Sequence, residues 1–444
     1  MALRFFGLFL VMPILAIEAK SLEGGTDFLA GLAVGGYALM QMIFQYPFGA
    51  LSDRIGRKKM IAIGMSVFAI GSAVCALADS ALVLIIGRFI QGTGAVSATI
   101  TAMISDLTGE ENRSKAMAMM GMSIACSFIV ALLVGPLAGG KYGVDTLFWV
   151  TCALVFPALL LLVLAPNPPK IKPIEPIKSG KIRRVFANRN LRRLNVAMFL
   201  HSFVMTASFF MIPMVLTQHE GFTLDTLWRV YLPALICGIL AMGIGTAIGE
   251  KLGAVKTVML IGVTILTATF VLIAAFPNGF VFWVMALFVG LNSLEPLMQS
   301  SAAKFARADE RGAALGIFNA CQFCGVFFGG ACAGAIYGDL GLQTLAIVLF
   351  ALCIVWFRLA LGIDNPRRSK TIAIEIPLSL GQGAIEKYKG VIECYRIEKL
   401  FVRYDPTITS GETLLERLRK ENDDHRRRSF RASGGTFSTD DRAR

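Results

Sequence analysis

Three ionisable side chains, Arg88, His201 and Glu295, lie inside long apolar stretches of the sequence. Such groups are costly to bury in apolar surroundings, so they usually mark a functional site or a specific pairing. A carboxyl group in a partly dehydrated site can exchange a proton near neutral pH, and a histidine titrates in the same range. Glu295 is therefore the first candidate for a proton carrier and His201 the second. A glutamate hydrogen-bonded between helices, or a histidine packed in a core, would give the same sequence pattern.

Arg4 begins another apolar stretch. Its position fits an anchor at the boundary of the apolar layer, and it also fits a cation that lines a cavity. No acidic residue occurs in the interior of the first six apolar stretches. A cationic compound would therefore find no carboxylate partner there, which argues against export of such compounds through this part of the chain. The other polar residues that we expect to line a substrate cavity are Tyr37, Gln41, Gln45, Asn292, Asn319 and Gln322.

The short segment "GALSDRIGRKK" (49–59) concentrates charge between two apolar stretches. Orientation in a membrane would explain its last basic residues, Arg57, Lys58 and Lys59. It does not explain Asp53, or the glycines at 49 and 56. Gly49 permits close approach of another helix, and Gly56 permits a turn that a side chain would obstruct. An acidic residue at a helix end can pair with basic groups or with the positive end of a neighbouring helix.

Composition identifies the chain as an integral membrane protein. Of its 444 residues, 55% are hydrophobic and 16% are charged, and the mean hydropathy is +0.65. Apolar stretches of about 20 residues, the length of a helix that crosses a bilayer, recur along most of the chain. The net charge of +13 lies largely in loops and a basic tail, so we expect no nucleic acid partner. Cys321 and Cys324 form a C-x-x-C without a second pair, and we expect no disulfide and no metal site.

Twelve membrane helices are predicted, at 3–18, 28–50, 60–78, 81–104, 115–138, 144–165, 194–217, 227–248, 256–276, 280–302, 312–335 and 342–362. Lysine and arginine are concentrated in alternate loops, whereas the opposite loops and helix starts carry only Lys20, Lys141 and Arg229. The positive-inside rule then places both termini in the cytosol. The first stretch has no small-residue cleavage site, so we expect a retained helix, and its short cytosolic end is compatible with a natural start upstream of Met1.

A basic, proline-rich linker (166–193) separates two six-helix halves, 1–165 and 194–365, and the halves resemble each other. "ALSDRIGRKK" aligns with "AIGEKLGAVK" (247–256), which pairs Asp53 with Glu250, Arg54 with Lys251 and Gly56 with Gly253. Further along, "EENRSKAM" (110–117) aligns with "ADERGAAL" (308–315) at nearly the same offset. These matches indicate duplication of a six-helix unit. Parallel repeats of this kind place a substrate site near the bilayer midplane, between halves that rock about it.

Three motifs, in chain order, resemble signatures of the major facilitator superfamily of secondary transporters. "GALSDRIGRKK" resembles its loop 2–3 signature, and "GRFIQGTGA" (87–95), with Arg88, Gln91 and Gly92, resembles its helix 4 signature. "GPLAGG" (135–140) resembles the helix 5 signature of the drug:proton antiporter branch; its residues are Gly135, Pro136, Gly139 and Gly140. That signature usually has another glycine where this chain has Ala131.

The resemblance implies an all-α membrane protein with two pseudo-symmetric halves. It implies a conformational latch in which Asp53 docks at the start of helix 11, near Gly312, when the cytosolic side is closed. Arg57 would reach Asp106 at the end of helix 4. Arg88 would serve in proton coupling or helix packing, and the helix 5 motif would seal the periplasmic side.

The composition changes abruptly after Arg368, where a small cytosolic domain is expected over 370–420. "TIAIEIP", "VIECYRI" and "KLFVRYD" are typical of strands. "LGQGAIEKYKG" (380–390) is expected to form a helix between the first two strands, and a helix with a Thr409–Glu412 capping box follows the third. The β-α-β-β-α order resembles the ferredoxin-like domain attached to some members of the superfamily. Such domains are similar to metal chaperones that bind copper through a C-x-x-C pair. This segment has a single cysteine, Cys394, so we expect it to bind a regulatory ligand or to self-associate and not to transfer copper. Residues 421–444 are expected to form a disordered basic tail.

The sequence therefore predicts a proton-coupled secondary transporter in a bacterial inner membrane, exporting an unidentified small molecule by antiport. Two alternatives remain: a uniporter or symporter on the same fold, and a transporter-like sensor that signals through its C-terminal domain. We expect no enzyme activity and no cofactor, since the chain has no P-loop, no H-E-x-x-H and no nucleophile elbow. Its expected partners are the substrate, protons and the lipid bilayer.

Overall fold

The structure is a computed structural model of the chain. It describes residues 1–108, 110–167, 179–307, 310–366, 370–374, 385, 388–396, 400–406, 408–418 and 420. The expected tail (421–444), most of the first helix expected in the C-terminal domain, and part of the linker lie outside these residues.

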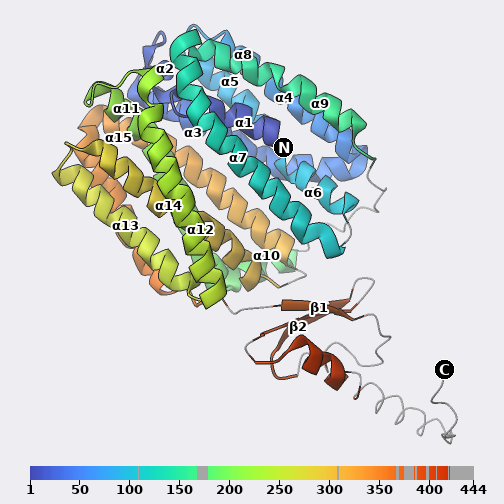
Figure 1. Cartoon of the computed structure of the whole chain (residues 1–444). Helices are drawn as coiled ribbons and strands as arrows, with labels where there is room; N and C mark the ends of the chain where they lie inside the picture. Colours follow the sequence, from blue (N-terminus) through green and yellow to red (C-terminus); the bar gives the residue numbers. More distant parts are fainter. Residues whose placement is uncertain are drawn as a thin grey trace, which may run out of the picture.

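The first half is built from helices that follow the predicted apolar stretches (Figure 1). They are α1 (Ala2–Leu10), α2 (Leu15–Ser21), α3 (Asp27–Ile55), α4 (Arg57–Ala76), α5 (Ala81–Thr93), α6 (Ser97–Leu107), α7 (Glu110–Tyr142), α8 (Val144–Ala153) and α9 (Val155–Leu164). The linker contributes α10 (Ser179–Ala187). The second half contains α11 (Arg189–Gln218), the short η1 (Leu224–Thr226), α12 (Trp228–Leu252), α13 (Val255–Ala275), α14 (Phe280–Phe305) and α15 (Arg311–Leu361).

The described helices account for the twelve predicted crossings. Ten helices are long and apolar enough to span a membrane, and the pair α1–α2, bent by 49°, makes an eleventh span. The 51-residue α15 contains two helices, because Gly341 has a non-helical backbone with φ 79° and ψ −179°. At 1.5 Å per residue, a helix of that length would be far longer than a bilayer is thick. The predicted fold class, an all-α membrane protein with a small α+β addition, is confirmed.

Two predicted helices are interrupted in the structure. The expected helix 81–104 is divided into α5 and α6 by the segment from Gly94 to Val96, and the expected helix 144–165 is divided at Leu154. Hydropathy does not reveal such breaks, because the residues at the break are as apolar as their neighbours. The break in the 81–104 segment places the beginning of a helix, Ser97, inside the membrane layer.

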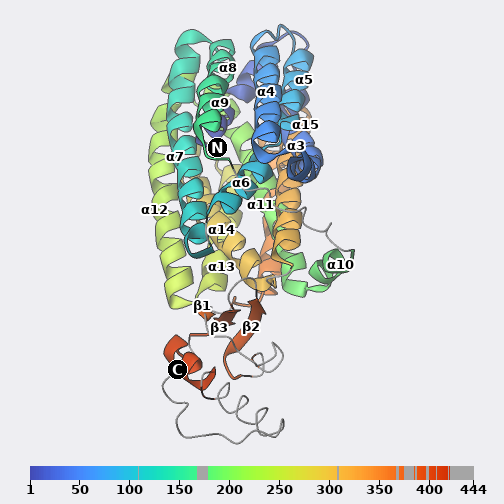
Figure 2. The ribbon, with the colours of Figure 1, turned by 90° about the vertical axis from the view of Figure 1, so that its right-hand side faces the viewer.

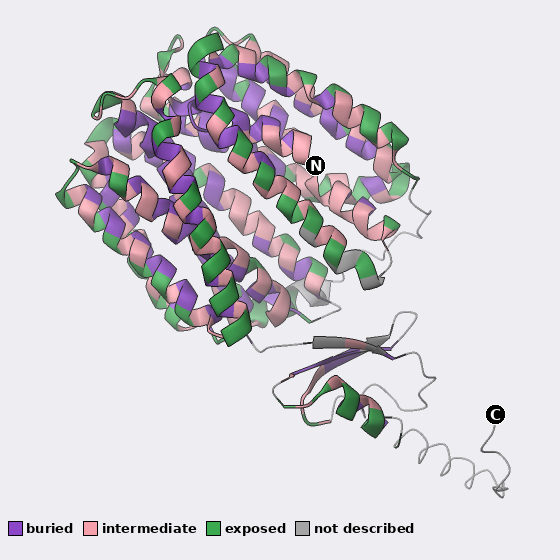
Figure 3. Cartoon of the chain, in the orientation of Figure 1, coloured by how far each residue is buried: buried purple, intermediate pink, exposed green. Residues whose placement is uncertain are grey.

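The two ends of the helical bundle differ in charge. We call the end with the turns near residues 56, 108, 253 and 306 the basic end, and the end with the turns near residues 25, 143, 279 and 341 the opposite end. The C-terminal sheet lies beyond the basic end (Figure 2). Buried residues gather on the faces between helices, while exposed residues cover the outside of the bundle (Figure 3).

The two halves meet at the opposite end through glycines on α3 and α15. A Cβ atom on Gly31 would collide with the carbonyl of Gly330, and a Cβ on Gly330 would collide with the carbonyl of Gly31. A Cβ on Gly35 would lie 2.7 Å from the carbonyl oxygen of Val326. The two backbones are therefore in direct contact, as small residues at four-residue spacing permit.

The same two helices separate toward the basic end. At Gly49 of α3, and at Gly312 and Gly316 of α15, an added Cβ would meet no atom within 4 Å. Gly31 and Gly49 are separated by about 27 Å of helix at 1.5 Å per residue. The close approach expected at Gly49 is therefore wrong for this conformation, and the glycines that do allow close approach lie at the opposite end.

The C-terminal part contains a three-stranded antiparallel sheet with the order β1-β3-β2. The strands are β1 (Lys370–Ile374), β2 (Val391–Arg396) and β3 (Leu400–Tyr404), and Lys370 pairs with Tyr404. Residues 411–418 are helical, and Ser410 Oγ accepts a hydrogen bond from the Thr413 amide at 3.1 Å. Ser410 therefore caps this helix in place of the expected Thr409–Glu412 box.

Gly330→Val should open the contact at the opposite end, because the added side chain has no space beside the Gly31 carbonyl. The measurement is labelling of Ala30→Cys, at a fully buried position, by a membrane-impermeant maleimide, compared with the same protein lacking this cysteine. We expect a several-fold rise in labelling rate. Gly316→Val, on the same helix but in open space, is the matched control and should leave the rate unchanged. Equal rates in both variants would show that the contact between α3 and α15 does not close the opposite end.

Candidate functional site

A cluster of charged residues closes the basic end of the first half. Helix α3 ends at Gly56, whose φ of 101° turns the chain directly into α4. Arg57 lies 2.5 Å from Asp53 Oδ1 and donates to Asp106 Oδ2 at 3.0 Å and to Ser52 Oγ at 2.6 Å. One guanidinium thus joins the ends of α3, α4 and α6.

The expected partner of Asp53, the start of α15, does not lie against this cluster. Asp53 pairs with Arg57 inside its own half, and Gly312 has open space around its Cα. Lys58 donates to the carbonyls of Val163 and Ala165, so it fixes the end of α9 and does not bridge the two halves. Asp53 is therefore free of the second half in a conformation where α3 and α15 are separated.

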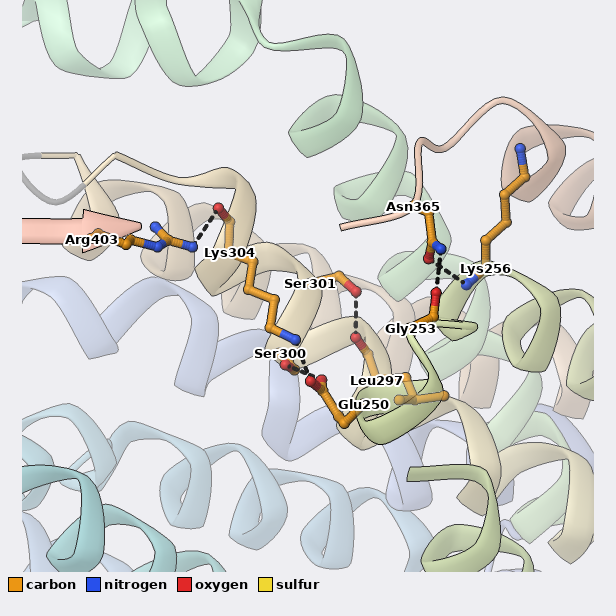
Figure 4. A network of polar contacts seen from close by, with 9 residues as sticks. All are labelled: Glu250, Gly253, Lys256, Leu297, Ser300, Ser301, Lys304, Asn365 and Arg403. Carbon is orange, nitrogen blue, oxygen red and sulfur yellow. Dashed lines mark hydrogen bonds and ion pairs between the residues drawn. The ribbon is translucent and has the colours of Figure 1, made fainter. Parts of the chain in front are cut away.

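The second half carries a counterpart of this cluster (Figure 4). Gly253 ends α12 with φ 70°, as Gly56 ends α3. Glu250, which aligns with Asp53, accepts from Ser300 Oγ at 2.7 Å and forms an ion pair with Lys304. Lys304 follows Asp106 by 198 residues, the same separation as between the aligned segments "EENRSKAM" (110–117) and "ADERGAAL" (308–315). Lys304 is therefore the counterpart of Asp106. The charge at the end of the fourth helix is thus reversed between the halves.

Lys304 also contacts the C-terminal domain (Figure 4). Its carbonyl accepts a hydrogen bond from Arg403 at 3.0 Å, and Arg403 lies 3.4 Å from Glu393. The linker helix α10 contacts the same region, because Arg184 pairs with Glu310 at 2.7 Å. The linker helix α10 and the C-terminal domain, which are both predicted to lie in the cytosol, therefore both contact the junction between α14 and α15.

The end of α15 is fixed to the start of α13 beside this network. Asn365 Oδ1 accepts from the Lys256 amide at 3.3 Å, and its Nδ2 donates to the Gly253 carbonyl. Lys256 Nζ donates to the Leu361 carbonyl at 2.7 Å. The chain that leaves the bundle toward the C-terminal sheet is thus anchored at its first residues.

Two of the three proton-coupling candidates lie within electrostatic reach of each other. His201 on α11 is 1% exposed, and its Nε2 lies 3.1 Å from the Leu291 carbonyl of α14. Glu295, one turn further along α14, is close enough to act electrostatically on the His201 ring. The ring packs edge-on against Trp356 with centroids 5.8 Å apart. Helix α14 continues through Pro296 without a break.

The third candidate, Arg88, lies in the other half. Its Nε donates to the Ala33 carbonyl at 3.0 Å, and its Nη1 donates to Gln91 Oε1 at 2.7 Å. Gln91 donates in turn to Ser72 at 2.8 Å. The guanidinium lies over the Tyr37 ring, 4.8 Å from its centroid. Gly92 of the same signature allows α5 to approach the Tyr37 carbonyl.

Arg4 is buried and is not a boundary anchor, so that interpretation was wrong. It is 2% exposed, its Nη1 donates to Ser97 Oγ at 2.8 Å, and its Nη2 donates to Gln41 Oε1 at 3.3 Å. Its guanidinium also lies near the Phe68 ring, 5.4 Å from the centroid. The importance of Ser97 was missed, and the glycines and alanine just before it (92–95) were the only available signal.

The other expected cavity residues are more dispersed. Asn292 donates to the Phe288 carbonyl of its own helix at 2.9 Å. Gln45 is half-buried, and its Oε1 has no hydrogen-bond partner. Asn319 and Gln322 are half-buried on α15. These residues do not form a single cluster with Arg4.

The helix 5 motif lies at the opposite end, inside α7 and not at its end. Gly135 lies against the Leu10 carbonyl, and Gly139 lies against Ile14, both in the first half. At Gly140, an added Cβ would be 2.6 Å from the Asp225 amide nitrogen of η1. This motif therefore joins α7 to the broken first helix and to the second half. The G-x-x-x-G spacings 31–35 and 330–334, which we did not single out from the sequence, supply a further contact between the two halves at this end.

The sequence matches the family model described as Major Facilitator Superfamily over residues 1–292 and again over 228–402. The chain belongs to the major facilitator superfamily. It is 31% identical over 433 residues to the inner membrane transport protein YajR of Escherichia coli K12, covering 94% of this chain and 95% of that protein. It is 35% identical over 140 residues to the class E tetracycline resistance protein of Escherichia coli, covering 31% of this chain and 34% of that protein.

The fold agrees with solved structures of other transporters. The human organic anion transporter MFSD10 matches with a TM-score of 0.63 at 19% identity, covering 81% of this chain and 96% of that one. The family predicted from the three motifs is confirmed. As a member of the major facilitator superfamily, the chain is a multi-pass membrane transporter of small molecules and not an enzyme.

The Glu250–Lys304 pair should contribute measurably to stability. Both side chains are partly exposed, at 33% and 20%, so we expect Glu250→Lys or Lys304→Glu alone to cost about 1 kcal/mol. The double exchange should recover most of that loss, since it restores opposite charges. Thermal unfolding of the three purified variants and the wild type measures this. A double variant less stable than either single one would show that the ion pair does not hold these helices.

Proposed function

We propose that this protein is a proton-coupled secondary transporter that exports a small molecule by antiport. The observation that carries the proposal is that Glu295 on α14 lies within electrostatic reach of the buried His201 on α11, so two titratable groups face each other from neighbouring spanning helices. A carboxyl group beside an imidazole at membrane depth can take up a proton from one side and release it to the other. Export is supported by a match of 37% identity over 135 residues to the MFS-type efflux pump MMF1 of Pseudozyma antarctica.

The basic end is the cytosolic side in this proposal, and the membrane is a bacterial inner membrane. Lysine and arginine in the loops of the basic end support this orientation. The halves touch at the opposite end through Gly31 and Gly330, while Asp53 is paired inside its own half. This arrangement corresponds to a state that faces the cytosol. Closing that side would bring Asp53 to the start of α15 near Gly312, and the latch would hold the alternate state.

The division of the chain is also part of the proposal. We assign two six-helix halves (1–165 and 194–365), a basic linker (166–193) and a ferredoxin-like domain (370–420). The sheet order β1-β3-β2 is consistent with three strands of that fold. The domain either binds a regulatory ligand or self-associates, and its contact with Lys304 places it where it can influence the junction of α14 and α15.

Glu295→Gln should reduce substrate-dependent proton flux to background, because glutamine cannot carry the proton. The measurement uses proteoliposomes with an internal pH dye, an imposed pH gradient and a screen of small amphiphilic compounds. Glu23→Gln removes an exposed carboxyl group at the opposite end and should keep full flux. Equal flux in Glu295→Gln and the wild type would place the proton carrier elsewhere. Substrate flux that ignores the pH gradient would favour a uniporter, and saturable binding without flux would favour a sensor.

Asp53→Asn should slow transport and leave folding largely intact. The neutral side chain weakens docking at α15, so the outward-facing state becomes less populated. Initial transport rates and the thermal unfolding midpoint are compared with those of Asp79→Asn, which neutralises an exposed carboxyl group at the opposite end. A wild-type rate in Asp53→Asn would refute the latch.

A further inference from the structure

We propose that the first half binds the anionic group of a small organic substrate through Arg4, Gln41 and the beginning of α6 at Ser97. The inference rests on the proposed transport function and names the class of compound that is carried. A carboxylate or phosphate-like group would replace the neutral side chains that now hold the Arg4 guanidinium.

The first observation is the excess of buried positive charge. Arg4 is 2% exposed and Arg88 is 0% exposed, and a guanidinium stays charged at any physiological pH. The ion pairs recorded among the described residues involve other basic side chains. Nε of Arg4 and Nη2 of Arg88 have no hydrogen-bond partner. Two cations are therefore buried in one half without an ion-pair partner among the described residues.

The second observation is the depth of Arg4. Its partner Gln41 is the central residue of the 29-residue α3. A charge at this depth has the highest cost of transfer from water, and contact with the Phe68 ring offsets only part of that cost. Retaining such a charge is explained if an anion neutralises it during the transport cycle.

The third observation is the break in the fourth membrane helix. After Gly94, whose ψ is 50°, the helix restarts as α6 at Ser97 without a side-chain cap. The first amide groups of a helix have no partner within it, and its beginning carries partial positive charge. The Thr99 hydroxyl in this first turn is also buried without a partner. Interrupted helices near the midplane are where transporters place the charged groups of their ligands.

The two arginines have different roles in this site. Arg88 is fixed by the Ala33 carbonyl and by Gln91, which Ser72 holds in turn. It adds positive potential and does not need to move. Arg4 is held by two neutral side chains, which a carboxylate can displace with a two-point, charge-assisted contact. Tyr37 lies within electrostatic reach of both guanidinium groups, and the Arg88 guanidinium lies over its ring.

Binding is tested first, on the purified full-length chain by thermal unfolding. The probes are benzoate and phenyl phosphate, with benzamide and benzylammonium as neutral and cationic counterparts. The anions should raise the unfolding midpoint, and the counterparts should not. Arg4→Gln should raise the half-saturating benzoate concentration about tenfold or more, whereas Arg4→Lys should retain part of the response. Arg229→Gln removes an exposed positive charge at the opposite end and should behave as the wild type.

A second variant tests the site even if Arg4→Gln does not fold. Gln41→Glu places a carboxylate of nearly the same shape beside Arg4, so the protein should become more stable and lose its response to benzoate. A purely structural Arg4 would give the added stability without any benzoate response in the wild type. Wild type that ignores both anions, Arg4→Gln that responds as the wild type, or protection by phosphatidylglycerol alone would overturn the proposal.

Flux separates this inference from the proposed function. In proteoliposomes of phosphatidylcholine, benzoate or phenyl phosphate should drive proton movement that depends on Arg4. Movement driven by benzamide or benzylammonium and not by the anions would overturn the anion site and leave proton-coupled transport intact. Anion binding that depends on Arg4 without any flux would support the site and contradict the transport mechanism.

Discussion

The backbone contact between α3 and α15 at the opposite end is the constraint on which the rest of this architecture depends. Glycines at 31, 35, 330 and 334 let carbonyl oxygens of one helix touch the backbone of the other, with no side chain between them. Van der Waals contact and Cα–H···O interactions hold such interfaces in membranes, where apolar side chains gain little from association. Because each helix is stiff, a contact at one end acts as a pivot and leaves the other end free to separate.

The charge clusters at the basic end follow from that freedom. In the first half, the guanidinium of Arg57 is shared by the carboxylates of Asp53 and Asp106. In the second half, α15 begins at Arg311, and its first amides add positive potential. In the proposed latch, Asp53 would approach this end of α15 when the two helices close. The Glu250–Lys304 pair is satisfied within its own half.

The sequence allowed the twelve crossings and the charged turns to be predicted, because apolar length and charge placement are set locally. The family also followed from motifs that lie within single segments. The contacts of Arg4 could not be predicted in this way, since Gln41 and Ser97 lie 37 and 93 residues away. The break before Ser97 was missed because Gly94 lies in a stretch with enough apolar residues on both sides to be predicted as one continuous helix. Gly49 was misjudged for a similar reason: a glycine permits close approach, and only the three-dimensional arrangement decides whether a helix is there to use it.

Helix α3 joins the functional parts of the first half. It carries Gly31 and Gly35 at the backbone contact with α15, Gln41 beside Arg4, and Asp53 in the charged cluster of the basic end. Pro47 lies between Gln41 and Asp53 and removes one backbone hydrogen bond, so the last part of α3 can bend separately from the rest. An anion that draws Arg4 away from Gln41 changes the contacts of α3 just before this flexible point. Neutralising the buried charge and releasing or engaging Asp53 would then be linked through one helix, without a separate element to transmit the change.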